Sequence, residues 1–125
     1  MRYTLTREEK LKSRKLIGRL FEEGSSLSEF PLRMIYLQTD YTSDYPTQVA
    51  FSVSKKRFGN AVDRNKIKRL LRECYRKNKY ILYDKLNDKY IIMFTFIDEK
   101  HYKYVELEEK MIQLLDKFLK KEKKE

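Results

Sequence analysis

Four cationic side chains recur at intervals of four residues near the middle of this 125-residue chain. They are Arg64, Lys68, Arg72 and Arg76, and no acidic residue interrupts the row. Like charges four residues apart repel one another along a helix, so the row is stabilised when a polyanion neutralises it. Asn65 beside the row adds a hydrogen-bond donor and acceptor for sugar or base edges. The pattern favours nucleic-acid binding over a merely solvated helix face, and RNA only weakly over DNA.

The helix that carries this row must also dock on a core. The spacing predicts a helix from about Ala61 to Lys77, after a turn around Gly59. On a wheel of ~100° per residue, its apolar and cationic stripes have centres roughly 140° apart. The apolar stripe consists of Ile67, Leu70, Leu71, Cys74 and Tyr75, and the second stripe of Asn65, Lys68, Arg69, Arg72 and Arg76. One face therefore packs on the core while a neighbouring face presents cations.

The net charge of the chain is concentrated in the same region. The whole chain has 29 Lys and Arg against 19 Asp and Glu, a net charge of +10. The stretch from Lys55 to Lys79 contains 11 basic and 2 acidic residues, a net charge of +9, and the remainder carries +1. A localised excess of this kind is the electrostatic footprint of a polyanion-binding surface.

Side chains for other chemistries are sparse. The single histidine, His101, lies in a polar stretch beside Lys100, which is a poor setting for a general base. Cys74 falls on the apolar stripe and is expected to be a buried thiol, and one cysteine forms no internal disulfide or Cys-rich zinc site. The carboxylates occur in mixed-charge runs that resemble solvated helix faces, not metal clusters. We therefore expect no catalytic residue and no metal site in the protein.

Periodicity along the chain predicts an α/β fold with a mixed sheet. The expected helices span about 6–23, 61–77 and 104–119, and the expected strands span 32–37, 48–54 and 90–97, with a short extra strand near 26–29. The segment from Gln48 to Ile97 has the length of a βαβ unit. The final residues, from Lys120 to Glu125, are expected to fray.

The strand over 48–54 alternates cleanly between large and small side chains. Val49, Phe51 and Val53 are expected to enter the core. Ala50, Ser52 and Ser54 form a small face that leaves room above the sheet. From spacing alone, this face fits an ordinary exposed sheet surface and a groove equally well.

Composition sets the class of the chain. Its length and its 41% hydrophobic content suit one domain with one core, spanning residues 1–125. No apolar run approaches the ~18 residues of a membrane helix, and the N-terminus resembles no signal segment. With a single cysteine, these features predict a cytoplasmic protein without a membrane partner.

The residues at 51–73, FSVSKKRFGNAVDRNKIKRLLRE, closely resemble the signature of the protein subunit of bacterial ribonuclease P. A strand ends in a Lys-Lys pair, a short Gly-containing spacer follows, and then comes Ala-Val-x-Arg-Asn-x-x-Lys-Arg-x-x-Arg-Glu. The segment ending Leu20-Phe21-Glu22-Glu23-Gly24 agrees as well. The resemblance implies an α+β sandwich similar to a ribosomal-protein domain, with a mixed four-stranded sheet and three helices. It also implies a left-handed β-α-β crossover, against the usual right-handed rule.

The resemblance implies a function as well. In this family the catalytic centre lies in an RNA subunit, which uses bound Mg²⁺ to remove the 5′ leader of precursor tRNA. The protein, a monomer in a 1:1 complex with that RNA, binds the leader and strengthens substrate and Mg²⁺ binding. The implied partners are the catalytic RNA and precursor tRNA, not DNA, and the Mg²⁺ is held mainly by the RNA.

Site residues follow from matching positions in the motif. The residues implied to bind the RNA subunit are Lys55, Lys56, Arg64, Asn65, Lys68, Arg69 and Arg72. Those implied to line the leader cleft, between the first helix and the open sheet face, are Ile17, Phe21, Arg33, Ile35 and Ser52. Ile17 replaces an aromatic residue of the family, and Arg33 and Ile35 align with positions that are often apolar or aromatic. Base stacking in the cleft, worth about 1–3 kcal/mol per base, is then expected to be weaker.

Two other functions remain as alternatives. A ribosomal or RNA-chaperone protein on a similar fold would share the basic helix but would not need an apolar groove for a leader. A metal-dependent nuclease acting alone would need clustered carboxylates, which the sequence does not present. Two aromatic side chains also stay open: Phe21 fits the core or the cleft, and Phe58 fits the space beneath the turn or an RNA contact.

Overall fold

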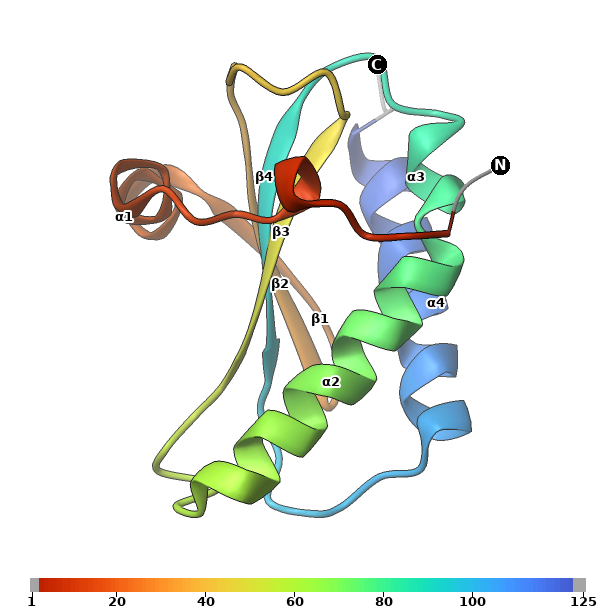
Figure 1. The fold of residues 1–125 in the computed structure, drawn as a ribbon. Coiled ribbons are helices and arrows are strands. Elements are labelled where there is room, and N and C mark those ends of the chain that lie inside the picture. The colour runs from red at the N-terminus through yellow and green to blue at the C-terminus, as the bar shows by residue number, and fades with distance from the viewer. Residues whose placement is uncertain (1–2, 123–125) are drawn as a thin grey trace.

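The computed structural model describes residues 3–122, which form a mixed four-stranded sheet flanked by helices (Figure 1). The strand order is β1-β2-β4-β3. The strands are β1 (Ser25–Glu29), β2 (Leu32–Gln38), β3 (Thr47–Val53) and β4 (Tyr90–Phe96). β2 pairs antiparallel with both β1 and β4, whereas β3 pairs parallel with β4. The predicted mixed sheet, including its short first strand, is confirmed.

Two long helices cover one face of the sheet. α2 (Ala61–Asn78) connects the parallel strands β3 and β4, and α4 (Tyr104–Glu122) lies beside it (Figure 1). The Asn60 side chain caps α2 by accepting the Val62 N–H at 2.8 Å. The predicted apolar stripe of α2 enters the core, although Leu70 is only partly buried. The face of β3 that carries Val49 and Val53 packs into the same cluster.

The opposite face of the sheet carries α1 (Arg14–Glu23), which covers one part of it (Figure 1). Ser13 caps this helix by accepting the Leu16 N–H at 3.2 Å. Leu20 of α1 packs with Leu11, Ile91 and Ile35 in a second, smaller apolar cluster. The sheet therefore separates a large core beneath α2 and α4 from a small core beneath α1.

The predicted helix over 6–23 is wrong in its first half. Residues Arg7–Glu9 form a short 3-10 helix, η1, and Lys10 then pairs in parallel with Val49 at the outer edge of β3. The Leu11 N–H donates to the Val49 carbonyl at 2.8 Å. The helical turn of η1 does not continue, because the Leu11 N–H bonds to the edge of β3 and because the Glu9 side chain is buried in the interior.

Two further boundaries differ from expectation. A single helical turn, α3 (Tyr80–Tyr83), follows α2 and was not predicted. α4 continues to Glu122, so the first half of the tail expected to fray is helical, and the Tyr90 hydroxyl donates to the Glu122 carboxylate at 2.7 Å. The rest of that tail, residues 123–125, lies outside the described residues.

Candidate nucleic-acid interface

The middle of the cationic row on α2 is free to meet a partner. Arg69 and Arg72 are exposed, as is Asn65, and Lys68 is half-buried. Within residues 3–122, no hydrogen bond or ion pair engages the side chains of Lys68, Arg69 or Arg72. Unneutralised cations on consecutive turns of one helix are suited to a run of phosphates.

The two ends of the row are occupied. The Arg64 guanidinium donates to the carbonyls of Phe58 and Gly59 at 2.7 and 2.8 Å, so it fastens the connection between β3 and α2. Arg76 forms an ion pair with Glu73 at 2.7 Å and donates to the Tyr3 carbonyl at 2.9 Å. The row itself contains no acid, but Glu73, three residues before Arg76 and outside the row, neutralises its last member.

The connection between β3 and α2 presents two more of the predicted cations. Lys55 and Lys56 are exposed, and the Lys56 N–H donates to the Ser54 hydroxyl at 3.1 Å. Phe58 is buried against Phe96 and His101, with ring centroids 5.9 and 5.2 Å apart. Phe58 therefore packs beneath the turn and anchors it.

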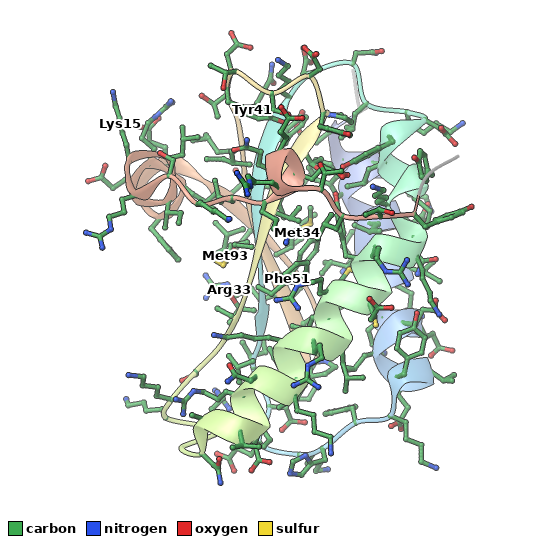
Figure 2. The ribbon with its side chains drawn as sticks, viewed as in Figure 1. Lys15, Arg33, Met34, Tyr41, Phe51 and Met93 are labelled. Carbon is green, nitrogen blue, oxygen red and sulfur yellow. The ribbon has the colours of Figure 1, made fainter. Side chains whose placement is uncertain are left out.

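The strand register defines the sheet face that α1 only partly covers. Paired residues point to the same side of a sheet, so two rows can be followed across the strands. The first row is Ser26, Ile35, Met93 and Ala50, and the second is Ser28, Arg33, Thr95 and Ser52. Figure 2 shows Arg33 and Met93 on the side of the sheet that faces α1, whereas Met34 and Phe51 point toward α2. This face is apolar near α1 and polar one row further on.

The predicted cleft residues are all at or beside this face. Arg33 is exposed, Ser52 is half-buried, and Ile35 lies beneath α1 in the small core. On α1, Ile17 packs against the small core, but Phe21 is 60% exposed. Phe21 is therefore not a core residue, and its ring is available to a partner.

Residues of β4 on this face were missed by sequence reasoning. The run over 90–97 was expected to be buried on both sides, yet Thr95 is half-buried and its hydroxyl lies 3.1 Å from that of Ser52. Met93 is almost fully buried in the small core, on the side of the sheet that faces α1. Thr95 interrupting an otherwise apolar run was the available signal.

A buried polar cluster, also missed, fixes the N-terminal segment that leads to α1. Glu9 is 0% and Lys79 1% exposed, and the Lys79 ammonium lies 2.7 Å from the Glu9 carboxylate. Lys79 also donates to the Thr4 carbonyl at 2.6 Å, and the Thr6 N–H and the Tyr83 hydroxyl donate to Glu9. Burial alone raises the pKa of Glu9, but these donors outweigh it and hold the pKa below its ordinary value.

The described residues offer little to other chemistries. No group of three or more His, Cys, Asp and Glu side chains within 3–122 is placed to hold a metal ion. Cys74 is buried, which raises the pKa of its thiol to about 12. No helix in the described part of the chain has the length and apolarity to cross a membrane.

Fold and surface together define a class of protein: a small α+β domain with a cationic helix on one side of a sheet and an open, partly polar face on the other. The chain matches the family model described as Ribonuclease P over residues 5–119. It is 41% identical over 90 residues to the ribonuclease P protein component of Porphyromonas gingivalis, a match that covers 71% of this chain and 65% of that one. The corresponding protein of Chlorobium phaeobacteroides is 42% identical over 83 residues, covering 64% of this chain and 57% of that one.

Solved structures agree with these relatives. The RNase P protein of Staphylococcus aureus superposes with a TM-score of 0.72 at 23% identity, covering 88% of this chain and 94% of that one. The RNase P protein of Thermotoga maritima superposes with a TM-score of 0.70 at 25% identity, covering 87% of this chain and 96% of that one. The chain belongs to the ribonuclease P protein family. The matched segments span less than two thirds of the curated relatives' own lengths.

Proposed function

We propose that this protein is the RNA-binding component of a ribonuclease P ribonucleoprotein, in which it assists a catalytic RNA in removing the 5′ leader of precursor tRNA. Family membership supports the enzyme, and the separation of two surfaces supports the division of labour. The single observation that carries the proposal is the set of unpaired cations Lys68, Arg69 and Arg72 on α2, on the opposite side of the sheet from a face that carries little charge.

The cationic surface is assigned to the RNA subunit. Arg69 and Arg72 supply unpaired charges for phosphates, with Lys68 beside them and Asn65 able to reach sugars or bases. Lys55 and Lys56 extend the surface into the connection that Arg64 and Phe58 hold in place. Arg64 acts here by positioning this connection, and its remaining N–H donors stay available to the same partner.

The open sheet face and α1 are assigned to the leader of the substrate. Phe21 provides an exposed ring on which a base can stack. The exposed edges of Ile35 and Met93 provide an apolar border beside α1, and Arg33 and Ser52 provide polar contacts. The sheet face that fitted an exposed surface or a groove equally well is, in this proposal, a groove.

Catalysis is assigned to the RNA. The Mg²⁺ ions that support phosphodiester hydrolysis are held mainly by RNA phosphates, and the protein strengthens their binding by fixing the substrate near them. In this proposal the protein is a cytoplasmic monomer that binds one RNA subunit, with precursor tRNA as the second RNA partner.

Reconstitution tests the proposal. The protein is mixed with a bacterial ribonuclease P RNA and a 5′-extended precursor tRNA at low Mg²⁺, with each component omitted in turn. We expect cleavage at the mature 5′ end only when both are present, and tighter binding of the precursor than of the leaderless tRNA. Cleavage by the protein alone would support an independent nuclease. RNA binding without stimulation of cleavage would support a ribosomal or chaperone role.

A further inference from the structure

Arg33 is an isolated charge on the open face of the sheet. All strand residues on this face are described, and Arg33 is the only one of them that is ionised. Within residues 3–122, no hydrogen bond or ion pair engages its guanidinium. By contrast, Arg19 at the rim is held by Glu23 and by the Thr39 hydroxyl at 2.9 Å. The five N–H donors of Arg33 are therefore available in a fixed planar fork.

The neighbours of Arg33 make its row rich in hydrogen-bond donors. Arg33 pairs across the strands with Thr95, and Thr95 pairs with Ser52. The hydroxyls of Thr95 and Ser52 lie 3.1 Å apart and share one hydrogen bond. Each hydroxyl can form further hydrogen bonds, so both remain able to bind a ligand. The next row toward α1 is apolar, with Ile35 opposite Met93. Ile35 and Met93 are only 9% and 8% exposed, so a planar base would rest against the open edge of this row and direct one of its own edges toward Arg33.

We propose that Arg33, aided by the Ser52 and Thr95 hydroxyls, makes this groove favour guanine over adenine and uracil in the leader; the inference rests on the proposed function. Guanine presents two adjacent acceptors, O6 and N7, which match the guanidinium fork. Adenine has an amino donor where guanine has O6, and in uracil the N3–H donor separates the two carbonyl acceptors. Cytosine presents adjacent acceptors, O2 and N3, only on its Watson–Crick edge. Arg33 is thus a specificity-determining residue, not a catalytic one.

The expected discrimination is modest because the groove is open to water. We expect a guanine-bearing leader to be favoured about tenfold over the adenine counterpart, equivalent to ~1.4 kcal/mol. A contact from Arg33 to a phosphate would instead favour every leader equally, because the backbone carries no sequence information.

The test uses the reconstituted RNA–protein holoenzyme and precursors with oligouridine leaders. A single guanosine, or a single adenosine, is placed at successive leader positions, and pairs of precursors compete in one reaction so that the ratio of kcat/KM is measured directly. A third series carries 7-deazaguanosine, which keeps O6 but lacks the N7 acceptor. Arg33→Met removes the donors while keeping an unbranched side chain, and Lys120→Met removes one charge from α4, which packs on the opposite face of the sheet.

We expect a guanosine preference at one leader position, reduced by 7-deazaguanosine, abolished by Arg33→Met and retained by Lys120→Met. Equal rates for guanosine and adenosine at every position would overturn the inference, as would a preference that survives Arg33→Met. A uniform loss with all leaders in Arg33→Met would assign Arg33 to a phosphate and also overturn it. If precursors with and without a leader bound equally well, the failure would lie in the proposed leader groove itself.

Discussion

The buried pair of Glu9 and Lys79 gives the sharpest test of how this fold is held together. Replacing Lys79 by Met keeps the aliphatic stem and removes the ammonium that lies 2.7 Å from the Glu9 carboxylate. The carboxylate is 0% exposed, so water cannot take the place of the lost partner. Breaking a buried pair by removing one member costs about 3–5 kcal/mol, because the remaining charge is left uncompensated.

Two of the donors to Glu9 survive in the Lys79→Met variant, the Thr6 N–H at 2.8 Å and the Tyr83 hydroxyl. They place the expected loss toward the lower end of that range, about 3 kcal/mol. A domain of this size has about 5–15 kcal/mol of stability, so the variant should still fold. Urea titration followed by circular dichroism measures the change in the free energy of unfolding.

A double variant and a control make the reasoning falsifiable. Glu9→Gln combined with Lys79→Met leaves no buried charge, so it should be less destabilised than the sum of the two single variants. Lys85→Met removes an exposed cation near α3 and should change stability by less than ~0.5 kcal/mol. A loss below ~1 kcal/mol in Lys79→Met, or strict additivity in the double variant, would refute the account of Glu9 as an uncompensated buried charge.

Three further predictions follow from the same structure. Folding lowers the pKa of Glu9 from an ordinary value of 4.5, so its contribution to stability is full above that pH and is lost as the pH falls through the folded pKa. The urea concentration at the unfolding midpoint should therefore decrease as the pH is lowered below about 4.5. The decrease should be less steep in Glu9→Gln. Arg69→Ala and Arg72→Ala should each reduce the slope of log affinity for the RNA subunit against log salt by about one, whereas Arg76→Ala should reduce it less, because Glu73 already pairs with Arg76; equal slopes for all four proteins would contradict this ranking. The buried Cys74 thiol, with a pKa of about 12, should react with a thiol reagent only as fast as the protein opens, and rapid labelling at neutral pH would contradict its burial.

Local periodicity was enough to predict most of the fold. The alternation of Val49, Phe51 and Val53 and the apolar stripe of α2 both identified core faces correctly. Contacts between distant segments were not predictable in the same way. Thr6 followed by Glu9 fits the capping box of a long helix. The Glu9 carboxylate does accept the Thr6 N–H, but its other bonds go to Lys79 and Tyr83, about seventy residues later. A single sequence contains no signal for that pairing.

The candidate site was predictable to the same degree. The unpaired cations Lys68, Arg69 and Arg72 followed from helical spacing. The roles of Arg64 and Arg76 did not follow from spacing. Their partners are backbone carbonyls and the Glu73 carboxylate, and helical spacing does not determine which of these a long arginine side chain reaches. Thr95 escaped notice because its exposure depends on how far α1 extends over the sheet, and α1 begins at Arg14, eight residues after the predicted start at Thr6.

One strand links the two surfaces of the protein, and this limits how they can move relative to each other. Ser52 of β3 faces the open sheet side, whereas Val53 enters the core, and the exposed Lys55 follows within three residues of Ser52. β3 is tied to β4 along one edge and to the N-terminal segment at Val49 along the other. That segment contributes Leu5 to the large core and Leu11 to the small core, so it joins the layers on both sides of the sheet. A leader in the groove and an RNA on α2 would therefore meet a single rigid body, in which Glu9 and Lys79 fasten the segment that carries α1.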